Sequence, residues 1–260
     1  MPRIAIIQVD VSDSENSQER LDRVLKVVAD QKGKCDIAIL PELWMDGAFN
    51  IERAKNNAQS ITGDFVTAIS STAKQAGIWL HAGSFAEKDA NEIFNTSILI
   101  RPDGLVVAAY RKIHLFGFEE SEALEFTPGA KVVVASGSPL GNVGLSTCYD
   151  VRFPELYRAS VNQNAQTFLV TSGWPESRIS HWRILLQARA IENQTWVVAC
   201  NEVGVNGDAR LGGHSLVISP LGEVVLETGH EPGIFYADID MALVDKTRNN
   251  FPVLKDQVLN

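Results

Sequence analysis

The chain has 260 residues, of which 45% are hydrophobic and 21% are charged, a composition that is typical of a globular protein and excludes a disordered one. The formal net charge is −9 and the lysines and arginines are scattered, so a nucleic-acid partner is not expected. No apolar run approaches the roughly 18 residues of a membrane helix, and the N-terminus has no apolar leader segment, so we expect a cytoplasmic protein with no membrane partner.

The first half of the chain alternates predicted strands and helices, as in βαβ units. Its predicted elements are a strand at Ile4 to Val11, a helix with apolar residues Leu21 to Val28, a strand at Asp36 to Leu40, a helix at Thr62 to Ala76, a strand at Ile78 to Phe85, and a hairpin of Asn95 to Arg101 with Leu105 to Arg111. Gly77 is typical of a residue that ends a helix, and Pro102, Asp103 and Gly104 are typical of a turn.

The second half repeats this alternation. Its predicted elements are strands at Lys131 to Ser136 and Gly141 to Cys148, a helix that opens at Phe153 to Glu155, a strand at Thr167 to Thr171, a helix at Ser180 to Asn193, a strand at Thr195 to Asn201, a hairpin from Ser215 to Glu227, and a strand at Gly233 to Asp238. Because no segment resembles a linker, we expect one layered α/β domain over residues 1–260, with two sheets face to face and helices outside.

Three cysteines, Cys35, Cys148 and Cys200, are an odd number and too widely spaced for a zinc knuckle. Cys148 stands where a predicted strand gives way to a helix, and Pro154 suits the first turn of that helix. Backbone N–H groups and the positive end of a helix at such a turn would lower the pKa of a thiol and stabilise an oxyanion. Cys148 is therefore the candidate nucleophile, although a buried structural cysteine is the commoner case and describes Cys200 well.

A cysteine nucleophile needs a group that accepts its proton. Glu42 follows a predicted strand at the edge where open α/β sheets bind ligands, among apolar residues that would raise the pKa of a carboxylate. A cysteine–histidine pair that uses His114 or His214 is the alternative. Lys112, at the end of another predicted strand, would supply a fixed cation, so the three groups together fit amide hydrolysis without a metal.

Three ordered motifs resemble the nitrilase superfamily of carbon-nitrogen hydrolases. They are Pro41-Glu42-Leu43, the segment from Arg111 to Phe116, and the segment from Cys148 to Glu155. The resemblance extends over essentially the whole chain, and the segments Ser172 to Trp182 and Ala188 to Gln194 look most like the omega-amidase-like bacterial branch. It implies a four-layer αββα sandwich, a catalytic set of Glu42, Lys112 and Cys148, no metal or cofactor, and a homodimer or higher homo-oligomer.

The family also places a second glutamate between the lysine and cysteine motifs. Its usual distance from a turn such as Pro128-Gly129 favours Glu122, and Glu120 is the alternative. Tyr149 and Trp174 are expected to line the substrate pocket. Structural ion pairs are the expected role of Asp150, Arg152, Glu155, Arg189 and Glu192. The alternative for an arginine, from Arg152, Arg178 or Arg183, is to bind a substrate carboxylate.

The function that these residues imply is hydrolysis of a small carboxamide to a carboxylic acid and ammonia through a thioester on Cys148. A 2-oxo acid amide is the substrate that the omega-amidase-like branch suggests. A nitrile or N-carbamoyl hydrolase would use the same three residues. A catalytically silent protein that binds a metabolite in the same cleft is the alternative from another class, although such a protein has no need of a reactive thiol.

Overall fold

Two six-stranded sheets form the centre of the protein, whose computed structural model describes residues 1–117 and 122–258. The first sheet consists, in spatial order, of β14 (Gly233–Asp238), β1 (Arg3–Gln8), β2 (Ile37–Ile39), β3 (Trp79–Asp89), β4 (Glu92–Ile100) and β5 (Val106–Arg111). The second consists of β13 (Val224–Glu227), β12 (Leu216–Ile218), β9 (Trp196–Cys200), β8 (Thr167–Thr171), β7 (Gly141–Thr147) and β6 (Val134–Ser138). Within each sheet three strands run parallel, β1, β2 and β3 in the first and β7, β8 and β9 in the second.

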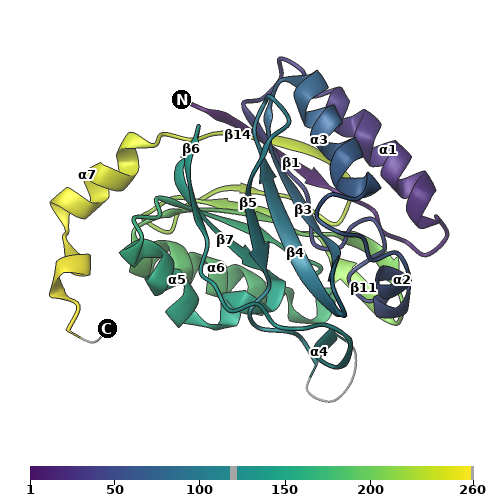
Figure 1. Cartoon of the computed structure of the whole chain (residues 1–260). Coiled ribbons are helices and arrows are strands. Elements are labelled where there is room, and N and C mark those ends of the chain that lie inside the picture. The colour runs from purple at the N-terminus through teal and green to yellow at the C-terminus, as the bar shows by residue number, and fades with distance from the viewer. Residues whose placement is uncertain (118–121, 259–260) are drawn as a thin grey trace.

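Helices cover the outer face of each sheet, so the order of layers is helix, sheet, sheet, helix (Figure 1). Helices α1 (Ser17–Ala29) and α3 (Asp64–Ala76) pack on the first sheet, and α5 (Pro154–Asn162) and α6 (Ile179–Asn193) pack on the second. The expected α/β fold with four αββα layers is confirmed.

The alternation of side chains along β1 explains these layers. Ile4 and Ile6 point into the core between the two sheets, whereas Ala5 and Ile7 point into the core beneath α1 and α3. Because both faces of the strand are covered, its sequence is a continuous apolar run and not an alternation of apolar and polar residues.

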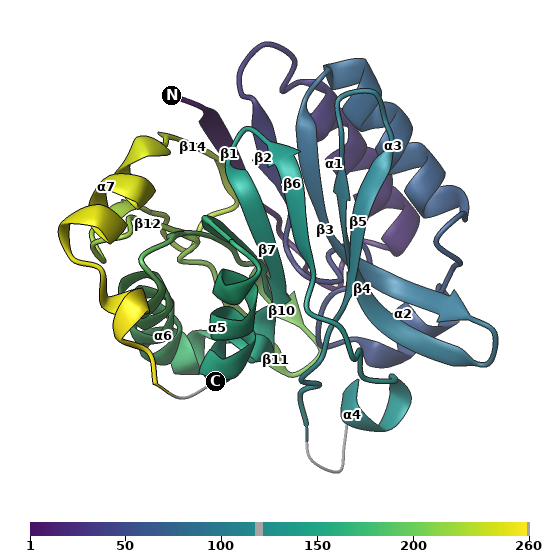
Figure 2. The ribbon, with the colours of Figure 1, turned by 60° about the vertical axis from the view of Figure 1, so that its left-hand side comes forward.

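The hairpins β4–β5 and β12–β13 form as predicted, with antiparallel pairing. Several short or polar elements were not predicted: α2 (Ile51–Asn56), α4 (Glu122–Glu125), α7 (Ala242–Asn250), and the small sheet of β10 (Val203–Asn206) and β11 (Ala209–Gly212). Helix α7 buries only Val244 and Thr247, so it shows little helical periodicity. It lies beside the ends of α5 and α6 (Figure 2), where Arg248 donates to the carbonyl of Ala165 at 2.8 Å.

Candidate active site

One pocket collects the chemically active residues at the strand ends. Glu42 lies shortly after β2, Lys112 directly follows β5, Cys148 directly follows β7, and Glu122 begins α4. All four line the same pocket, and all four are buried. The structure therefore brings together residues that are up to 106 positions apart in the sequence. The strands that precede Glu42 and Cys148 belong to different sheets.

Lys112 joins the two carboxylates of the pocket. Its Nζ lies 2.7 Å from Oε1 of Glu42 and 2.7 Å from Oε2 of Glu122, and the residue is 1% exposed. Ion pairs shielded from water in this way hold their geometry, because either carboxylate left alone would be an uncompensated buried charge.

Asn95, on β4, links the same carboxylates and was not anticipated from the sequence. Its Nδ2 donates to Oε1 of Glu42 at 2.9 Å and to Oε1 of Glu122 at 2.7 Å. The second oxygen of Glu42 accepts the backbone N–H of Gly173 at 2.9 Å. Glu42 thus keeps a fixed orientation through three donors, from a lysine, an amide and the backbone.

The backbone of Phe116 holds Glu122 in the pocket by donating its N–H to Oε2 at 2.9 Å. Glu120, the alternative for the second glutamate, lies outside the described residues. Glu122 thus contacts Lys112, Asn95 and the backbone of Phe116.

The backbone at Cys148 is in the left-handed region, with φ at 47°, which is uncommon for a residue that is not glycine. Strain of this kind persists only where the surroundings enforce it. Asp150 helps to hold this backbone conformation, because its Oδ2 accepts the N–H of Thr147 at 2.8 Å and the hydroxyl of Tyr110 at 2.6 Å. It also accepts from the His114 N–H at 3.1 Å, so one carboxylate ties the turn of Cys148 to the segment of Lys112.

The prediction that the setting of Cys148 lowers its pKa is wrong. Burial raises the pKa of the Cys148 thiol well above its ordinary value and Glu42 raises it further, while Lys112 opposes them only in part. The turn after β7 is a short 3-10 helix, Cys148–Arg152, and α5 starts only at Pro154. The thiol therefore holds its proton at neutral pH.

The neighbouring carboxylates keep Lys112 positively charged despite its burial. Burial lowers the pKa of Lys112, but Glu122 and Glu42 outweigh burial, and the result lies well above the ordinary value. The pKa of Glu122 is raised by burial and by Glu42, against the opposing effect of Lys112. Lys112 is consequently a permanent cation over the working pH range.

Tyr149 and Trp174 line the pocket, and Arg152 and Arg178 join them. The guanidinium of Arg152 lies 4.9 Å from the ring centroid of Trp174, and that of Arg178 lies 5.6 Å from the ring of Phe116. Arg152 makes no ion pair with the described residues and faces the pocket instead. Of the other residues suggested for ion pairs, Asp150 pairs with His114, and Arg189 pairs with Glu192 at 2.8 Å.

Three other candidates lie away from the pocket. His114 stacks on Phe153 at 3.7 Å between ring centroids, and His214 contacts Glu227, so neither histidine lines the pocket with Cys148. Arg183 likewise pairs with Glu227, at 3.1 Å. Sequence position alone could not separate Arg183 from Arg178, because both stand at the start of the same helical region.

Over residues 1–117 and 122–258, no three histidine, cysteine, aspartate or glutamate side chains converge in a way that could hold a metal ion. In the same part of the chain no helix has the length and apolar character to cross a membrane.

The fold and the pocket define a class: a four-layer αββα protein whose pocket joins a thiol, an ammonium group and two carboxylates. A family model described as carbon-nitrogen hydrolase matches residues 3–249. A 2-oxoglutaramate amidase of Paenarthrobacter nicotinovorans is 36% identical, covering 98% of this chain and 88% of the relative. A 2-oxoglutaramate amidase of Bacillus subtilis (strain 168) is 34% identical, covering 97% of this chain and 96% of the relative. The chain belongs to the carbon-nitrogen hydrolase family.

Solved structures are similar over the same length. A CN-hydrolase superfamily protein of Xanthomonas campestris, with an arsenic adduct in its active site, superposes with a TM-score of 0.91 at 28% identity, covering 100% of this chain and 98% of that chain. A mutant amidase from Nesterenkonia sp. AN1, in which acrylamide has added to the active-site cysteine, superposes with a TM-score of 0.84 at 28% identity, covering 98% and 100%. The expected family, and the expected hydrolase acting on carbon-nitrogen bonds other than peptide bonds, are confirmed.

Proposed function

We propose that the protein is an amidase that converts a small carboxamide to a carboxylic acid and ammonia, with Cys148 as nucleophile. One observation carries this proposal: a buried lysine lies between two buried carboxylates and faces the same pocket as a buried thiol. In these roles Glu42 moves protons, Lys112 supplies positive charge, and Glu122 positions Lys112. Glu122, Tyr149 and Trp174 complete the proposed site, the last two as pocket walls.

The first half of the reaction forms a thioester. Glu42 accepts the proton of the Cys148 thiol as Sγ bonds to the carbonyl carbon of the amide, which places a negative charge on the oxygen. The ammonium of Lys112 and the backbone N–H of Tyr149 stabilise that oxyanion. The carbon-nitrogen bond then breaks, Glu42 returns its proton to the nitrogen, and ammonia leaves.

The second half releases the acid. Water attacks the thioester carbonyl while Glu42 accepts a proton from it, and the same oxyanion contacts act again. The carbon-sulfur bond breaks, the proton held by Glu42 returns to the sulfur of Cys148, and the carboxylic acid departs. Because the thiol has a raised pKa, it regains its proton readily and the resting state is restored.

The reaction itself is tested with a panel of small amides, nitriles and N-carbamoyl amino acids, with release of ammonia as the readout. We expect turnover of amides and a covalent adduct on Cys148 whose mass, in a quenched reaction, equals that of the acyl group. Turnover restricted to nitriles or carbamoyl compounds would reassign the substrate. An absence of turnover and adduct with every compound would indicate a binding protein.

For the substrate we infer an amide that carries a carboxylate at its other end, as in a 2-oxo acid amide. Arg152 and Arg178 line the pocket, and within residues 1–117 and 122–258 neither pairs with a carboxylate of the protein. Guanidinium groups bind carboxylates with two parallel hydrogen bonds. The relatives named 2-oxoglutaramate amidase support this choice, and so does the zebrafish (Danio rerio) relative named omega-amidase, which is 32% identical.

Replacing Arg178 by alanine tests the inferred carboxylate contact. We expect KM for 2-oxoglutaramate to rise about tenfold to a hundredfold, the usual effect of losing a charge-assisted pair worth about 1.5 to 3 kcal/mol. The matched control is Arg183→Ala, which removes the arginine that pairs with Glu227 outside the pocket and should leave KM unchanged. Equal effects of the two substitutions would refute the assignment.

We also infer that residues 1–260 form one carbon-nitrogen hydrolase domain, because β14 from the end of the chain pairs with β1 from its start. The apolar side chains of Ile184, Ile191 and Leu221 are more than half exposed, which favours burial against another copy in a homodimer or higher homo-oligomer. We also propose that the protein is located in the cytoplasm.

A further inference from the structure

Glu202 is a further buried acid that lies next to the pocket without lining it. Glu202, between β9 and β10, is 0% exposed, and neither of its carboxyl oxygens makes a hydrogen bond with the described residues that meets ordinary geometry. The backbone N–H of Ala48 acts on this carboxyl in the direction that lowers its pKa. Because almost all buried polar groups in proteins are hydrogen-bonded, an orphaned acid beside an active site calls for an explanation.

The carboxyl of Glu202 lies directly behind the pocket wall. A Cβ built on Gly173 would lie 2.7 Å from Oε2 of Glu202 and 2.2 Å from Cβ of Ala48, so only glycine fits at position 173. Ala48 and Gly173 both line the pocket, and the N–H of Gly173 donates to Glu42. Glu202 is therefore separated from Glu42 by the thickness of a single residue.

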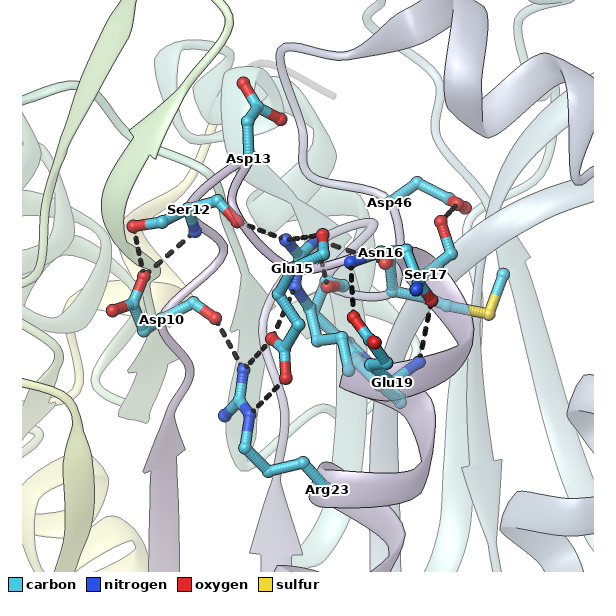
Figure 3. A network of polar contacts seen from close by, with 12 residues as sticks. Asp10, Ser12, Asp13, Glu15, Asn16, Ser17, Glu19, Arg23 and Asp46 are labelled. Carbon is cyan, nitrogen blue, oxygen red and sulfur yellow. Dashed lines mark hydrogen bonds and ion pairs between the residues drawn. The ribbon is translucent and has the colours of Figure 1, made fainter.

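Titratable groups approach Glu202 from α1, from the segment after β2 and from β9. The guanidinium of Arg20, from α1, interacts electrostatically with the Glu202 carboxyl but does not form an ion pair with it. Its hydrogen bonds go instead to Glu15 and to backbone carbonyls, including that of Met45 at 3.1 Å. Glu42 approaches from the segment after β2, and Cys200 from β9. Figure 3 shows the polar network at the start of α1, where Ser17 donates to Asp46 and so helps to hold the segment that leads to Ala48.

We propose that Glu202 is a positioning residue for Glu42, which in its uncharged form supports Gly173 and Ala48 from behind and keeps the Gly173 N–H directed at Glu42. The proposal rests on the amidase function proposed above. Glu202 contacts neither substrate nor the reacting atoms, and it acts only through Gly173.

The surroundings of Glu202 favour the uncharged form. Burial raises the pKa of Glu202 well above its ordinary value and Glu42 raises it further, whereas Arg20 and the Ala48 N–H lower it only in part. If Glu202 lost its proton, two carboxylates would oppose each other across Gly173. The folded protein therefore keeps one proton that an unfolded chain releases above a pH of about 4.3.

A comparison of stability between wild type and Glu202→Gln tests this charge state without a substrate. Because the pKa of Glu202 is higher in the folded state, the wild type loses stability relative to the glutamine variant as pH rises from the unfolded towards the folded pKa. We expect the ratio of the wild-type to the variant unfolding constant, measured in denaturant from pH 5 upward, to rise with pH by up to about tenfold per pH unit. Parallel stability curves would overturn the proposal.

The positioning role is tested by Glu202→Ala. We expect kcat to fall about tenfold to a hundredfold with KM within about threefold, because a small displacement of a catalytic group lowers the rate by that order. Glu202→Gln should keep kcat within about twofold at pH 7. The control is Gln31→Ala, which truncates an equally buried polar side chain at the far end of α1 and should leave kcat unchanged.

Three results would overturn the proposal: an unchanged kcat in Glu202→Ala, a loss in Glu202→Gln as large as that in Glu202→Ala, or an equal loss in Gln31→Ala. If the wild type hydrolyses no amide, the proposed function fails separately. In that case the rate of Cys148 alkylation by iodoacetamide replaces kcat, since Glu42 must still remove the thiol proton, and an unchanged rate in Glu202→Ala would overturn the positioning role.

Discussion

Replacing Cys148 by alanine should abolish amide hydrolysis and leave the fold intact. In the proposed mechanism the substitution removes the group that forms a bond to the substrate carbon, and removal of the nucleophile typically lowers kcat by several orders of magnitude. The turn at Cys148 is held by the Asp150 carboxylate, which accepts the backbone N–H of Thr147, and an alanine at position 148 retains that contact. The measurement is ammonia release over hours, alongside thermal unfolding of both proteins.

The other two thiols provide matched controls. Cys200 is fully buried and donates to the carbonyl of Ile7, and burial raises the pKa of Cys35 to about 11. Cys35→Ala and Cys200→Ala should keep kcat within about twofold, although the second substitution also removes a buried contact. Undiminished hydrolysis by the Cys148→Ala protein would exclude the thioester mechanism.

Replacing Lys112 by methionine should lower kcat by at least a hundredfold. One fixed donor to an oxyanion is worth about 3 to 4 kcal/mol in the transition state, and Lys112 is such a donor in the proposed mechanism. The same substitution leaves Glu42 and Glu122 buried without a cation, which should reduce stability by about 3 to 5 kcal/mol. Steady-state kinetics and denaturant unfolding measure the two effects separately.

A second variant separates catalysis from stability. Adding Glu122→Gln to Lys112→Met removes one of the two unpaired carboxylates, so part of the lost stability should return. The lost activity should not return, because no cation faces the oxyanion. Recovery of kcat in parallel with stability, or a loss of only twofold in the single variant, would show that Lys112 is structural.

The sequence was most informative where a residue type and a strand end coincide. Glu42, Lys112 and Cys148 each follow a predicted strand, and the ends of strands are where open α/β sheets place their ligand sites. The layered fold was predictable for the same reason, because β1 and β2 are continuous apolar runs that must be covered on both faces.

Contacts that depend on residues far apart in the chain were not predictable. Asn95 reads as an ordinary strand residue, and only the fold places its amide between Glu42 and Glu122. The pKa of Cys148 was predicted in the wrong direction because the local turn was considered without the burial that the whole sandwich imposes. Glu202 carries no signal in sequence, since a glutamate after a strand is usually solvated.

The proposed base and the proposed nucleophile belong to different sheets, with Glu42 beyond β2 and Cys148 beyond β7. The sheets meet near the pocket where the hydroxyl of Thr171 donates to the carbonyl of Leu40 at 3.0 Å. The gap across which a proton must pass is thus set by the thickness of the sandwich, and hence by the volume of the side chains packed inside it. We therefore expect the hydrolytic rate to depend on how the core is packed. Adding or removing a methyl group in that core, far from the substrate, should change the rate.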